Sequence, residues 1–456
     1  MPKTDVPHEI HHDIPDEHQR QRIGGWMPAD HRIHNNWLSE QVKHVDNNPQ
    51  ELNPVLKEFG DMVKSSTKLR MLATAMFEEI PNRGARPYKL DPAGHKQIRD
   101  FDHLLQVLNH IMRQGPHFTE HQAQVGLVGV PMNATLDWPM ATPSGYALFL
   151  DSDFNAGMKK ELVAVSLTLL IVPESAKVLH KNKTGWFGKT AINDVCTVAN
   201  EATGPGSQLQ FHDCFKCDPN HETFGYKSWD EFFTRELADG YRETADPDDD
   251  SVIVNACESK PFNVQHNIKL VDEFWTKGNK YSLSDMMAGD DLAPQFVGGT
   301  VYQAFLSALS YHRWHAPVSG TIKKAFVADG TYFSEKISSA IFMTNDAAES
   351  KAGLTSSQSY IAHLATRAII FMEADNPDIG LMCFIGIGMD EVSTCEITVK
   401  EGDHVKKGQC TGMFHFGGSS HTLIFRKGVN PSGFPKPGQN VNVPVRSKLA
   451  TVHKKQ

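Results

Sequence analysis

The stretch Phe414-His-Phe-Gly-Gly-Ser-Ser-His-Thr-Leu-Ile-Phe425 places two glycines and two serines between apolar segments that are typical of β-strands. By frequency, a Gly-Gly-Ser-Ser sequence is a glycine bulge or a hairpin turn. A second interpretation is cleavage of the chain by itself, in which the Ser419 hydroxyl attacks the carbonyl of Gly418. Gly417 and Gly418 suit this reaction because glycine adopts strained backbone conformations and leaves its carbonyl open to attack.

Self-cleavage needs a base, because a serine hydroxyl is a weak nucleophile at its ordinary pKa. His312 and His315, in Tyr311-His-Arg-Trp-His-Ala-Pro-Val-Ser-Gly320, are the candidates. Glu258, in Val254-Asn-Ala-Cys-Glu-Ser-Lys260, is a candidate carboxylate to orient a histidine and stabilise its charged form. Taken alone, the histidines also fit a hydrogen-bonded pair at the start of a strand, and Glu258 fits a surface or salt-bridged residue.

The chain changes character along its 456 residues, a length that favours about three domains. Up to residue 205 apolar residues recur at helical spacing, with Pro131–Gly145 expected to be a loop. After residue 250 apolar runs between turn residues predict strands, with a polar insertion or loop over Lys336–Tyr360. We predict a polar, His-rich tail over 1–22, a helical domain over 23–205, a joining segment over 206–250 with a short amphipathic helix within 226–235, and a catalytic domain over 251–456.

The predicted fold class is α+β, a helical N-terminal domain followed by a mainly β domain. The segment Glu401-Gly-Asp-His-Val-Lys-Lys-Gly408 resembles the half-barrel hairpins of lipoyl and biotinyl carrier domains, in which a modified lysine lies at an exposed tip. Lys406 or Lys407 could take that position. An unprocessed carrier or binding module is therefore the alternative from another functional class.

Charge and composition exclude several partners. The net charge of −9 leaves no basic footprint for nucleic acid or for an anionic membrane. The longest apolar run, Leu162–Val172, is shorter than the about 20 residues of a spanning helix, so we expect a buried helix and no stable membrane anchor. Seven cysteines without a signal peptide indicate reduced thiols and a cytoplasmic location.

One further cluster has the spacing of a zinc site. It consists of His212, Cys214, Cys217 and His221. No second pair of ligands follows at the usual distance, so we favour two reduced thiols in a loop and predict no metal site.

Five segments together resemble the phosphatidylserine decarboxylase family of pyruvoyl enzymes. They are Phe232-Phe-Thr-Arg235, Ala256-Cys-Glu-Ser259, Lys277-Gly-Asn-Lys-Tyr-Ser-Leu283, Tyr311-His-Arg-Trp-His315 and Gly417-Gly-Ser-Ser420. The order of these segments over residues 226–445 makes the match specific. The resemblance is greatest to the fungal branch of the family that acts on a free amino acid.

The resemblance implies a role for each matching residue. Ser419 would become a covalent pyruvoyl group, Gly418 would supply the carbonyl that is cut, and His315 would be the base. Glu258 stands where most members of the family have Asp, and Ser420 where many have Thr. His312, Gly417 and Ser420 would be supporting residues. Of the family's Asn-Glu-Arg segment only Arg367 remains, within Ala365-Thr366-Arg367.

Cleavage would give a β chain of residues 1–418 and an α chain of residues 419–456 that remain partners. The implied activity is pyruvoyl-dependent decarboxylation of a free aromatic L-amino acid, with L-tryptophan giving tryptamine as the first candidate. The alternative within the enzyme class is decarboxylation of phosphatidylserine to phosphatidylethanolamine. We expect a small-molecule amino acid substrate and no nucleic-acid partner.

Overall fold

The computed structural model describes residues 31–79, 98–113, 115–118, 131–140, 142–272, 281–334, 352–389, 394–415, 419–438 and 441–453. The chain forms two compact units. The first comprises Met1–Pro116, Glu120–Leu169 and Phe333–Ser357, and the second comprises His117–Thr119, Leu170–Tyr332 and Gln358–Gln456. The tail expected over residues 1–22 lies outside the described residues, and the boundaries expected at 205 and 250 stay a prediction.

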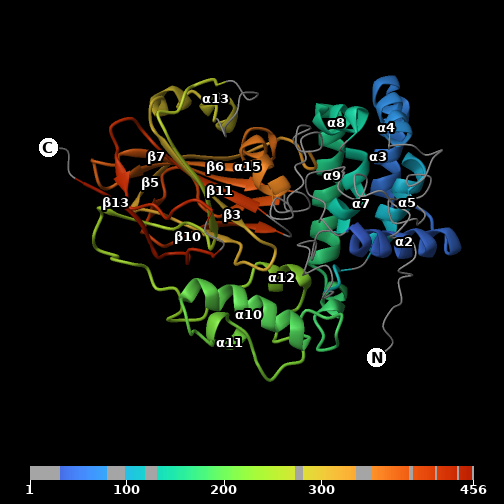
Figure 1. Ribbon diagram of the computed structural model, residues 1–456, viewed down its shortest axis with the longest axis horizontal. Helices are drawn as coiled ribbons and strands as arrows, with labels where there is room; N and C mark the ends of the chain where they lie inside the picture. Colours follow the sequence, from blue (N-terminus) through green and yellow to red (C-terminus); the bar gives the residue numbers. More distant parts are fainter. Residues whose placement is uncertain are drawn as a thin grey trace, which may run out of the picture. The chain divides into compact units, whose positions relative to one another are not determined.

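The described part of the first unit is helical (Figure 1). Its helices are α2 (His31–Asn47), α3 (Pro54–Ser65), α4 (Thr67–Glu79), α5 (Phe101–Ile111), α7 (Pro131–Met140), α8 (Pro143–Leu150) and α9 (Ser152–Leu170), the last of which ends at the unit boundary. The helical stripe that begins at Phe101 is buried along α5, as the spacing predicts. None of the helices in the described part of the chain combines the length and the apolar character that crossing a membrane requires.

The loop expected over Pro131–Gly145 was a wrong prediction, because this stretch contains α7 and the start of α8. Pro131 and Pro143 each occupy the first position of a helix, where the missing N–H of proline costs nothing. Thr142 caps α8, since its hydroxyl accepts a hydrogen bond from the Gly145 N–H at 3.0 Å. Prolines that begin helices were therefore misread as residues that break them.

The second unit is built around antiparallel sheets with short helices beside them. The helices are η2 (Pro173–Val178), α10 (Lys189–Thr203), α11 (Phe211–Cys214), α12 (Trp229–Phe233), α13 (Leu283–Met286), η3 (Ala293–Phe296) and α15 (Ala352–Leu364), the last of which spans the unit boundary. Because α15 is helical, the loop expected up to Tyr360 is corrected for residues 352–360, while 335–351 lie outside the described residues. The helix expected within residues 226–235 is present as α12.

The largest sheet has the strand order β2-β3-β11-β7-β6-β5-β9, and every pair of neighbours is antiparallel. Its strands are β2 (Lys260–His266), β3 (Thr300–Leu306), β5 (Gly320–Ala328), β6 (Arg367–Ala374), β7 (Leu381–Gly388), β9 (His404–Val405) and β11 (Ser419–Phe425). Figure 1 shows β3, β11, β6 and β7 side by side in this sheet. The fold is therefore α+β with a strand-rich C-terminal half, as the sequence predicts.

Two three-stranded sheets complete the unit, with orders β4-β10-β8 and β1-β13-β12. Their strands are β1 (Val252–Val254), β4 (Arg313–His315), β8 (Thr394–Ile397), β10 (Cys410–His415), β12 (Pro431–Ser432) and β13 (Lys448–Val452). One apolar core joins all three sheets, and Trp314 lies within it. A Cβ on Gly412 would lie 2.6 Å from the Trp314 ring, so only glycine admits the indole here.

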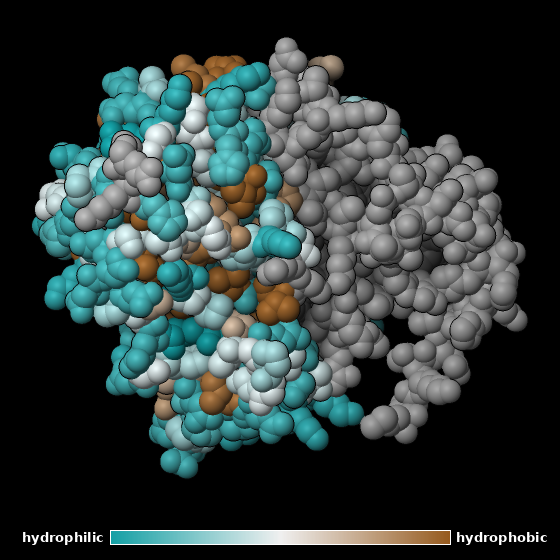
Figure 2. All heavy atoms as spheres, turned by 60° about the vertical axis from the view of Figure 1, so that its left-hand side comes forward, coloured by the Kyte–Doolittle hydropathy of each residue, from teal (hydrophilic) through white to brown (hydrophobic). Residues whose placement is uncertain are grey.

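The outer surface has the opposite character. Among the coloured, described residues in the face shown in Figure 2, hydrophilic side chains predominate and hydrophobic ones are scattered among them. Among the described residues of the second unit, the large hydrophobic side chains that are exposed are Ile171, Leu270, Val271, Val297, Val327 and Val441.

Candidate functional site

Ser419 is the first residue of β11, in the middle of the large sheet. It lies opposite Leu306 of β3 on one side and Gly388 of β7 on the other. Ser419 is 0% exposed, and its Oγ is a buried hydroxyl that has no hydrogen-bond partner among the described residues. A buried orphan polar atom is uncommon in a folded protein and calls for an explanation. Gly417 and Gly418, predicted to flank the cut bond, lie outside the described residues.

Strand β10, which precedes residues 416–418, ends in His415, a histidine that contacts two carboxylates. His415 Nδ1 lies 2.8 Å from Asp230 Oδ1, and its Nε2 lies 2.8 Å from Glu396 Oε2. Burial lowers the pKa of His415, but the hydrogen bonds and charges of the two carboxylates outweigh burial and raise that pKa above its ordinary value. The chain is therefore fixed by a histidine held between two carboxylates before residues 416–418 and by β11 after them.

Ser420 points to the opposite face of β11 and belongs to a buried polar network. Gln303 Nε2 donates to Ser420 Oγ at 2.9 Å, and Tyr281 Oη donates to Gln303 Oε1 at 2.6 Å. Gln303 also donates to the Gln358 carbonyl of α15 at 3.1 Å. The Tyr-Ser motif that begins at Tyr281 thus supports β11 directly behind Ser419.

His315 ends β4 and is buried, with defined contacts on both ring nitrogens. Its Nδ1 lies 2.9 Å from the Gly408 carbonyl, and its Nε2 lies 3.0 Å from Tyr311 Oη. Arg446 Nε lies 3.2 Å from Nδ1 but only 2.9 Å from the Gly408 carbonyl. If His315 Nδ1 carries the proton, both Nδ1 and Arg446 Nε donate to the Gly408 carbonyl. Nε2 of His315 is then an acceptor for the Tyr311 hydroxyl.

The charge state of His315 agrees with that assignment. Burial, followed by the nearby charge of Arg446, lowers the pKa of His315 to about 3. The imidazole is therefore neutral at physiological pH and has one basic nitrogen. Burial also raises the pKa of Tyr311, which keeps that hydroxyl protonated as a donor.

His312 lies nearer than His315 to the end of β10 that leads to Ser419. The Phe414 N–H donates to the His312 carbonyl at 3.0 Å, whereas His315 lies opposite Cys410. The His312 ring is buried and stacks on Phe233 with ring centroids 4.2 Å apart. Its role as a supporting residue stays a prediction.

The Phe-Phe-x-Arg motif supports the turn before His312. Arg235 is buried, and its Nη2 donates to the carbonyls of Leu309 and Ser310 at 3.0 and 3.1 Å. This motif therefore fixes the backbone that presents the two histidines.

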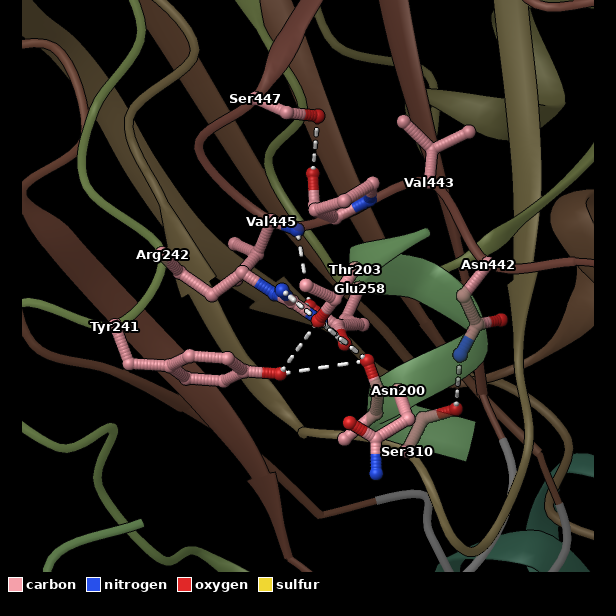
Figure 3. Close-up of polar contacts among 12 residues, drawn as sticks. Asn200, Thr203, Tyr241, Arg242, Glu258, Ser310, Asn442, Val443, Val445 and Ser447 are labelled. Atoms are coloured by element: carbon pink, nitrogen blue, oxygen red, sulfur yellow. Dashed lines mark hydrogen bonds and ion pairs between the residues drawn. The ribbon is translucent and has the colours of Figure 1, made fainter. Parts of the chain in front are cut away.

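Glu258 contacts Arg242 instead of His315, which corrects the contact expected from the sequence. Arg242 Nε and Nη2 donate to the two oxygens of Glu258 at 2.8 Å each (Figure 3). The Val445 N–H donates to Glu258 Oε2 at 3.1 Å. Glu258, His315 and Ser419 are all described residues, and no hydrogen bond joins Glu258 to His315 or His315 to Ser419.

Backbone hydrogen bonds nevertheless link the segment that contains Glu258 to the surroundings of His315. Val443 and Ser259 exchange backbone hydrogen bonds of 2.8 and 3.3 Å, and the Arg446 N–H donates to the Asn255 carbonyl at 2.8 Å. The segment 443–446 is thereby paired with 255–259, and Arg446 extends from it to the carbonyl that binds His315. Glu258 thus positions the neighbour of the histidine and not the histidine itself.

Two other hypotheses from the sequence concern a carrier lysine and a metal cluster. Lys407 Nζ is bound to the carbonyls of Asp246 and Asp249 at 2.6 and 2.7 Å, so Lys407 is not an exposed carrier lysine, whereas Lys406, the other candidate, is exposed. Among the described residues, which include His212, Cys214, Cys217 and His221, no group of three or more His, Cys, Asp or Glu side chains could hold a metal ion.

Arg367 is the remaining residue of the altered family segment. Its guanidinium donates to the carbonyls of Met286, Ala365 and Asp285. It therefore fixes the end of α13 against the start of β6, which is a structural role.

A pocket of about 1030 Å³ lies along α10 and the loop that follows it. None of the candidate site residues Ser419, His315, His312 and Glu258 lines it. The lining residues are Lys189, Ile192, Asn193, Cys196, Thr197, Asn200, Glu201, Gly204, Pro205, Gly206, Ser207, Gln208, Leu209, Gln210 and Val441. The buried serine and not this surface pocket identifies the site.

Several residues of the site were missed in the sequence. Tyr311 adjoins the His312 motif, and His421 follows Ser419 at the two-residue period of a strand, so both had a signal. Gln303 and Arg242 had none, because their partners lie far away in the sequence.

Comparison with known proteins gives the class and then the family. The sequence patterns of two phosphatidylserine decarboxylase domains match residues 53–195 and 229–446. Decarboxylase iboD of Amanita muscaria is 43% identical over 334 residues, which cover 72% of this chain and 92% of that protein. The chain is an enzyme of the decarboxylase class. It belongs to the phosphatidylserine decarboxylase family, whose members use a covalent pyruvoyl group.

Two further relatives are named for different substrates. The L-tryptophan decarboxylase of Psilocybe cubensis is 30% identical over 436 residues, which cover 92% of each chain. The phosphatidylserine decarboxylase proenzyme of Fusobacterium nucleatum is 33% identical over 202 residues, which cover 44% of this chain and 61% of that protein. The expected family is confirmed, and the alternative of a carrier module is set aside.

Proposed function

We propose that the chain cuts itself between Gly418 and Ser419 and that the mature enzyme decarboxylates a free aromatic L-amino acid, with L-tryptophan to tryptamine as the first candidate. The observation that carries the proposal is Ser419 Oγ, a buried hydroxyl without a partner at the start of a central strand. That position fits a group that must be shielded from water and held rigidly.

The cleavage needs no reagent other than water. Ser419 Oγ attacks the Gly418 carbonyl, and the bond from that carbonyl to the Ser419 nitrogen breaks to give an ester. Elimination then releases the Gly418 carboxylate and leaves a dehydroalanine at position 419. Addition of water and loss of ammonia convert this residue into the pyruvoyl group.

We assign the base to His315. It is neutral, and its Nδ1 bond to the Gly408 carbonyl leaves Nε2 as the basic atom. Tyr311 occupies Nε2, so it must release this atom before Ser419 can use it. General base help of this kind supplies about 10²- to 10⁴-fold in rate.

The fold would hold the two products together. In the α chain, β11 pairs with β3 and β7, and β13 pairs with β1, all of which belong to the β chain. A covalent pyruvoyl group supplies an electron-accepting carbonyl beside the nitrogen of the substrate. The residues around position 419 would orient the substrate and exclude water.

The similarity pattern supports an amino acid as the substrate. Relatives named L-tryptophan decarboxylase match 92% of this chain, whereas relatives named phosphatidylserine decarboxylase match between 44% and 81% of it. We also propose a cytoplasmic location, which the seven cysteines present as thiols favour. Phosphatidylserine remains the alternative substrate.

Intact mass and substrate assays test the proposal. The wild-type protein should separate into fragments 1–418 and 419–456 on a denaturing gel, and Ser419→Ala should remain a single inactive chain. Two fragments from Ser419→Ala would reject the assignment of the nucleophile. Wild-type protein should release tryptamine from L-tryptophan, and turnover of phosphatidylserine in liposomes without turnover of tryptophan would select the alternative.

A further inference from the structure

His421 lies two residues after Ser419 on the same face of β11, because side chains alternate along a strand. It is 0% exposed. The aromatic rings of Tyr302 and Phe384 surround it, with centroids 6.0 and 6.1 Å from the imidazole. No step of the proposed cleavage uses this histidine.

The tautomer of His421 follows from its one polar contact. His421 Nε2 lies 3.0 Å from Ser259 Oγ, and Ser259 Oγ donates its own proton to the Cys257 carbonyl at 3.0 Å. Ser259 can then only accept from the imidazole, so Nε2 carries the proton. The other nitrogen, Nδ1, is left with a lone pair.

Nδ1 of His421 is buried and has no hydrogen-bond partner in the part of the chain that the structure describes. Burial lowers the pKa of His421 to about 3, so the ring stays neutral and Nδ1 stays an acceptor. A fully buried acceptor without a donor costs free energy unless a ligand or water supplies one. Ser419 Oγ is an orphan on the same face of the same strand.

We propose that His421 Nδ1 accepts a hydrogen bond from the amino group of the amino acid substrate as this group approaches residue 419. Residues 419 and 421 are about 7 Å apart along a strand. That spacing accommodates one nitrogen at a reactive distance of about 3 Å from residue 419 and at hydrogen-bond distance from the imidazole. The inference rests on the proposed function and adds a residue that positions the substrate.

Two substitutions separate the two nitrogens of the ring. Asparagine can place Oδ1 where Nδ1 lies but does not reach Ser259, so His421→Asn keeps the acceptor and loses the structural bond. His421→Gln does the reverse. A role in amine binding predicts a large loss for the glutamine variant alone, whereas a merely structural role predicts the larger loss for the asparagine variant.

The measurement is the rate at which amines add to the mature protein. Tryptamine or phenethylamine is added with cyanoborohydride, and the mass gain of the fragment 419–456 is followed. We expect His421→Gln to slow addition by about 10- to 100-fold and His421→Asn to stay within about fivefold of wild type. Thr422→Val, which changes the neighbouring side chain on the opposite face of β11, should not change the rate.

A second experiment varies the side chain of the substrate. The loss in His421→Gln should be the same for kcat/KM with tryptophan and with phenylalanine, because both carry the amino group. A loss confined to tryptophan would mean that Nδ1 binds the indole N–H, and this outcome overturns the proposal. Equal rates for the glutamine and wild-type proteins also overturn it.

The tautomer can be measured without any turnover. Long-range ¹H–¹⁵N spectra of the uncleaved Ser419→Ala protein, labelled at histidine, should show the His421 proton on Nε2, with the signal assigned by its loss in His421→Gln. A proton on Nδ1 would remove the acceptor and reject the inference. If wild-type protein never separates into two fragments, the proposed function fails, and the spectra still decide the tautomer.

Discussion

Glu258 and Arg242 form a bidentate ion pair, in which both nitrogen-to-oxygen distances are 2.8 Å. The side chains of Glu258 and Arg242 are 4% and 5% exposed. Burial lowers the pKa of Arg242, but the hydrogen bonds and charge of Glu258 outweigh it and raise that pKa above its ordinary value. The Arg242 Nη2 also donates to the Ala199 carbonyl at 2.9 Å near the end of α10. The pair therefore connects α10 to the backbone beside His315.

Removing one member of this pair should destabilise the protein strongly. Glu258→Gln leaves the Arg242 charge buried and unpaired, so we expect the free energy of unfolding to fall by about 3–5 kcal/mol. Urea denaturation of the uncleaved Ser419→Ala protein measures the loss. The double variant Glu258→Leu, Arg242→Met should recover much of it, and a double variant as unstable as Glu258→Gln would contradict the prediction.

His315 and Tyr311 should have opposite importance for cleavage. His315→Gln should slow the appearance of the two fragments by about 10²- to 10⁴-fold, because it removes the base. Tyr311→Phe should continue to cleave, since loss of the hydroxyl releases Nε2. Time courses on denaturing gels distinguish them, and equal arrest in both variants would show that Tyr311 passes the proton on.

Three buried histidines should make the fold sensitive to acid. Burial lowers the pKa of His315 and His421 to about 3 and that of His363 to about 4. The unfolded chain takes up protons near pH 6.5 and the folded chain does not, so stability is complete above about pH 6.5 and falls as pH drops toward 4. Each histidine contributes up to about 1.4 kcal/mol per pH unit to the slope of the free energy of unfolding against pH.

Denaturation at several pH values tests this slope. His421→Gln in the Ser419→Ala protein should lower the number of protons taken up on unfolding by about one, because it removes a histidine that becomes charged only on unfolding. His415→Gln is the contrast, because the raised pKa of His415 stabilises the fold below about pH 6.5 and that contribution is lost as pH rises through the raised value. An unchanged slope in His421→Gln would contradict the neutral buried state.

The network behind Ser419 should depend on Gln303. Gln303→Leu leaves the buried Tyr281 hydroxyl without its acceptor, and we expect a loss of about 1–3 kcal/mol in the free energy of unfolding. Adding Tyr281→Phe removes the unsatisfied hydroxyl and should restore part of the loss. Urea denaturation of the single and double variants checks this, and no recovery in the double variant would show that packing dominates.

The sequence predicted the strands beside the candidate site. Apolar segments on both sides of the two glycines are the strands β10 and β11, and the histidine motif, expected at the start of a strand, contains β4. Prolines were harder to interpret, since Pro131 and Pro143 begin helices here and were expected to lie in a loop. Local patterns say that a proline interrupts a structure, but they do not say whether it begins or ends one.

By itself, the sequence determined the family, the α+β class and the residue types available for chemistry, because periodicity and short motifs depend only on neighbours along the chain. Only the tertiary structure decided the partners of those residues. Glu258 pairs with Arg242 and not with His315, and His421 keeps an acceptor without a donor. Hydrogen bonds between distant segments depend on strand register and burial, and folding alone brings those segments together.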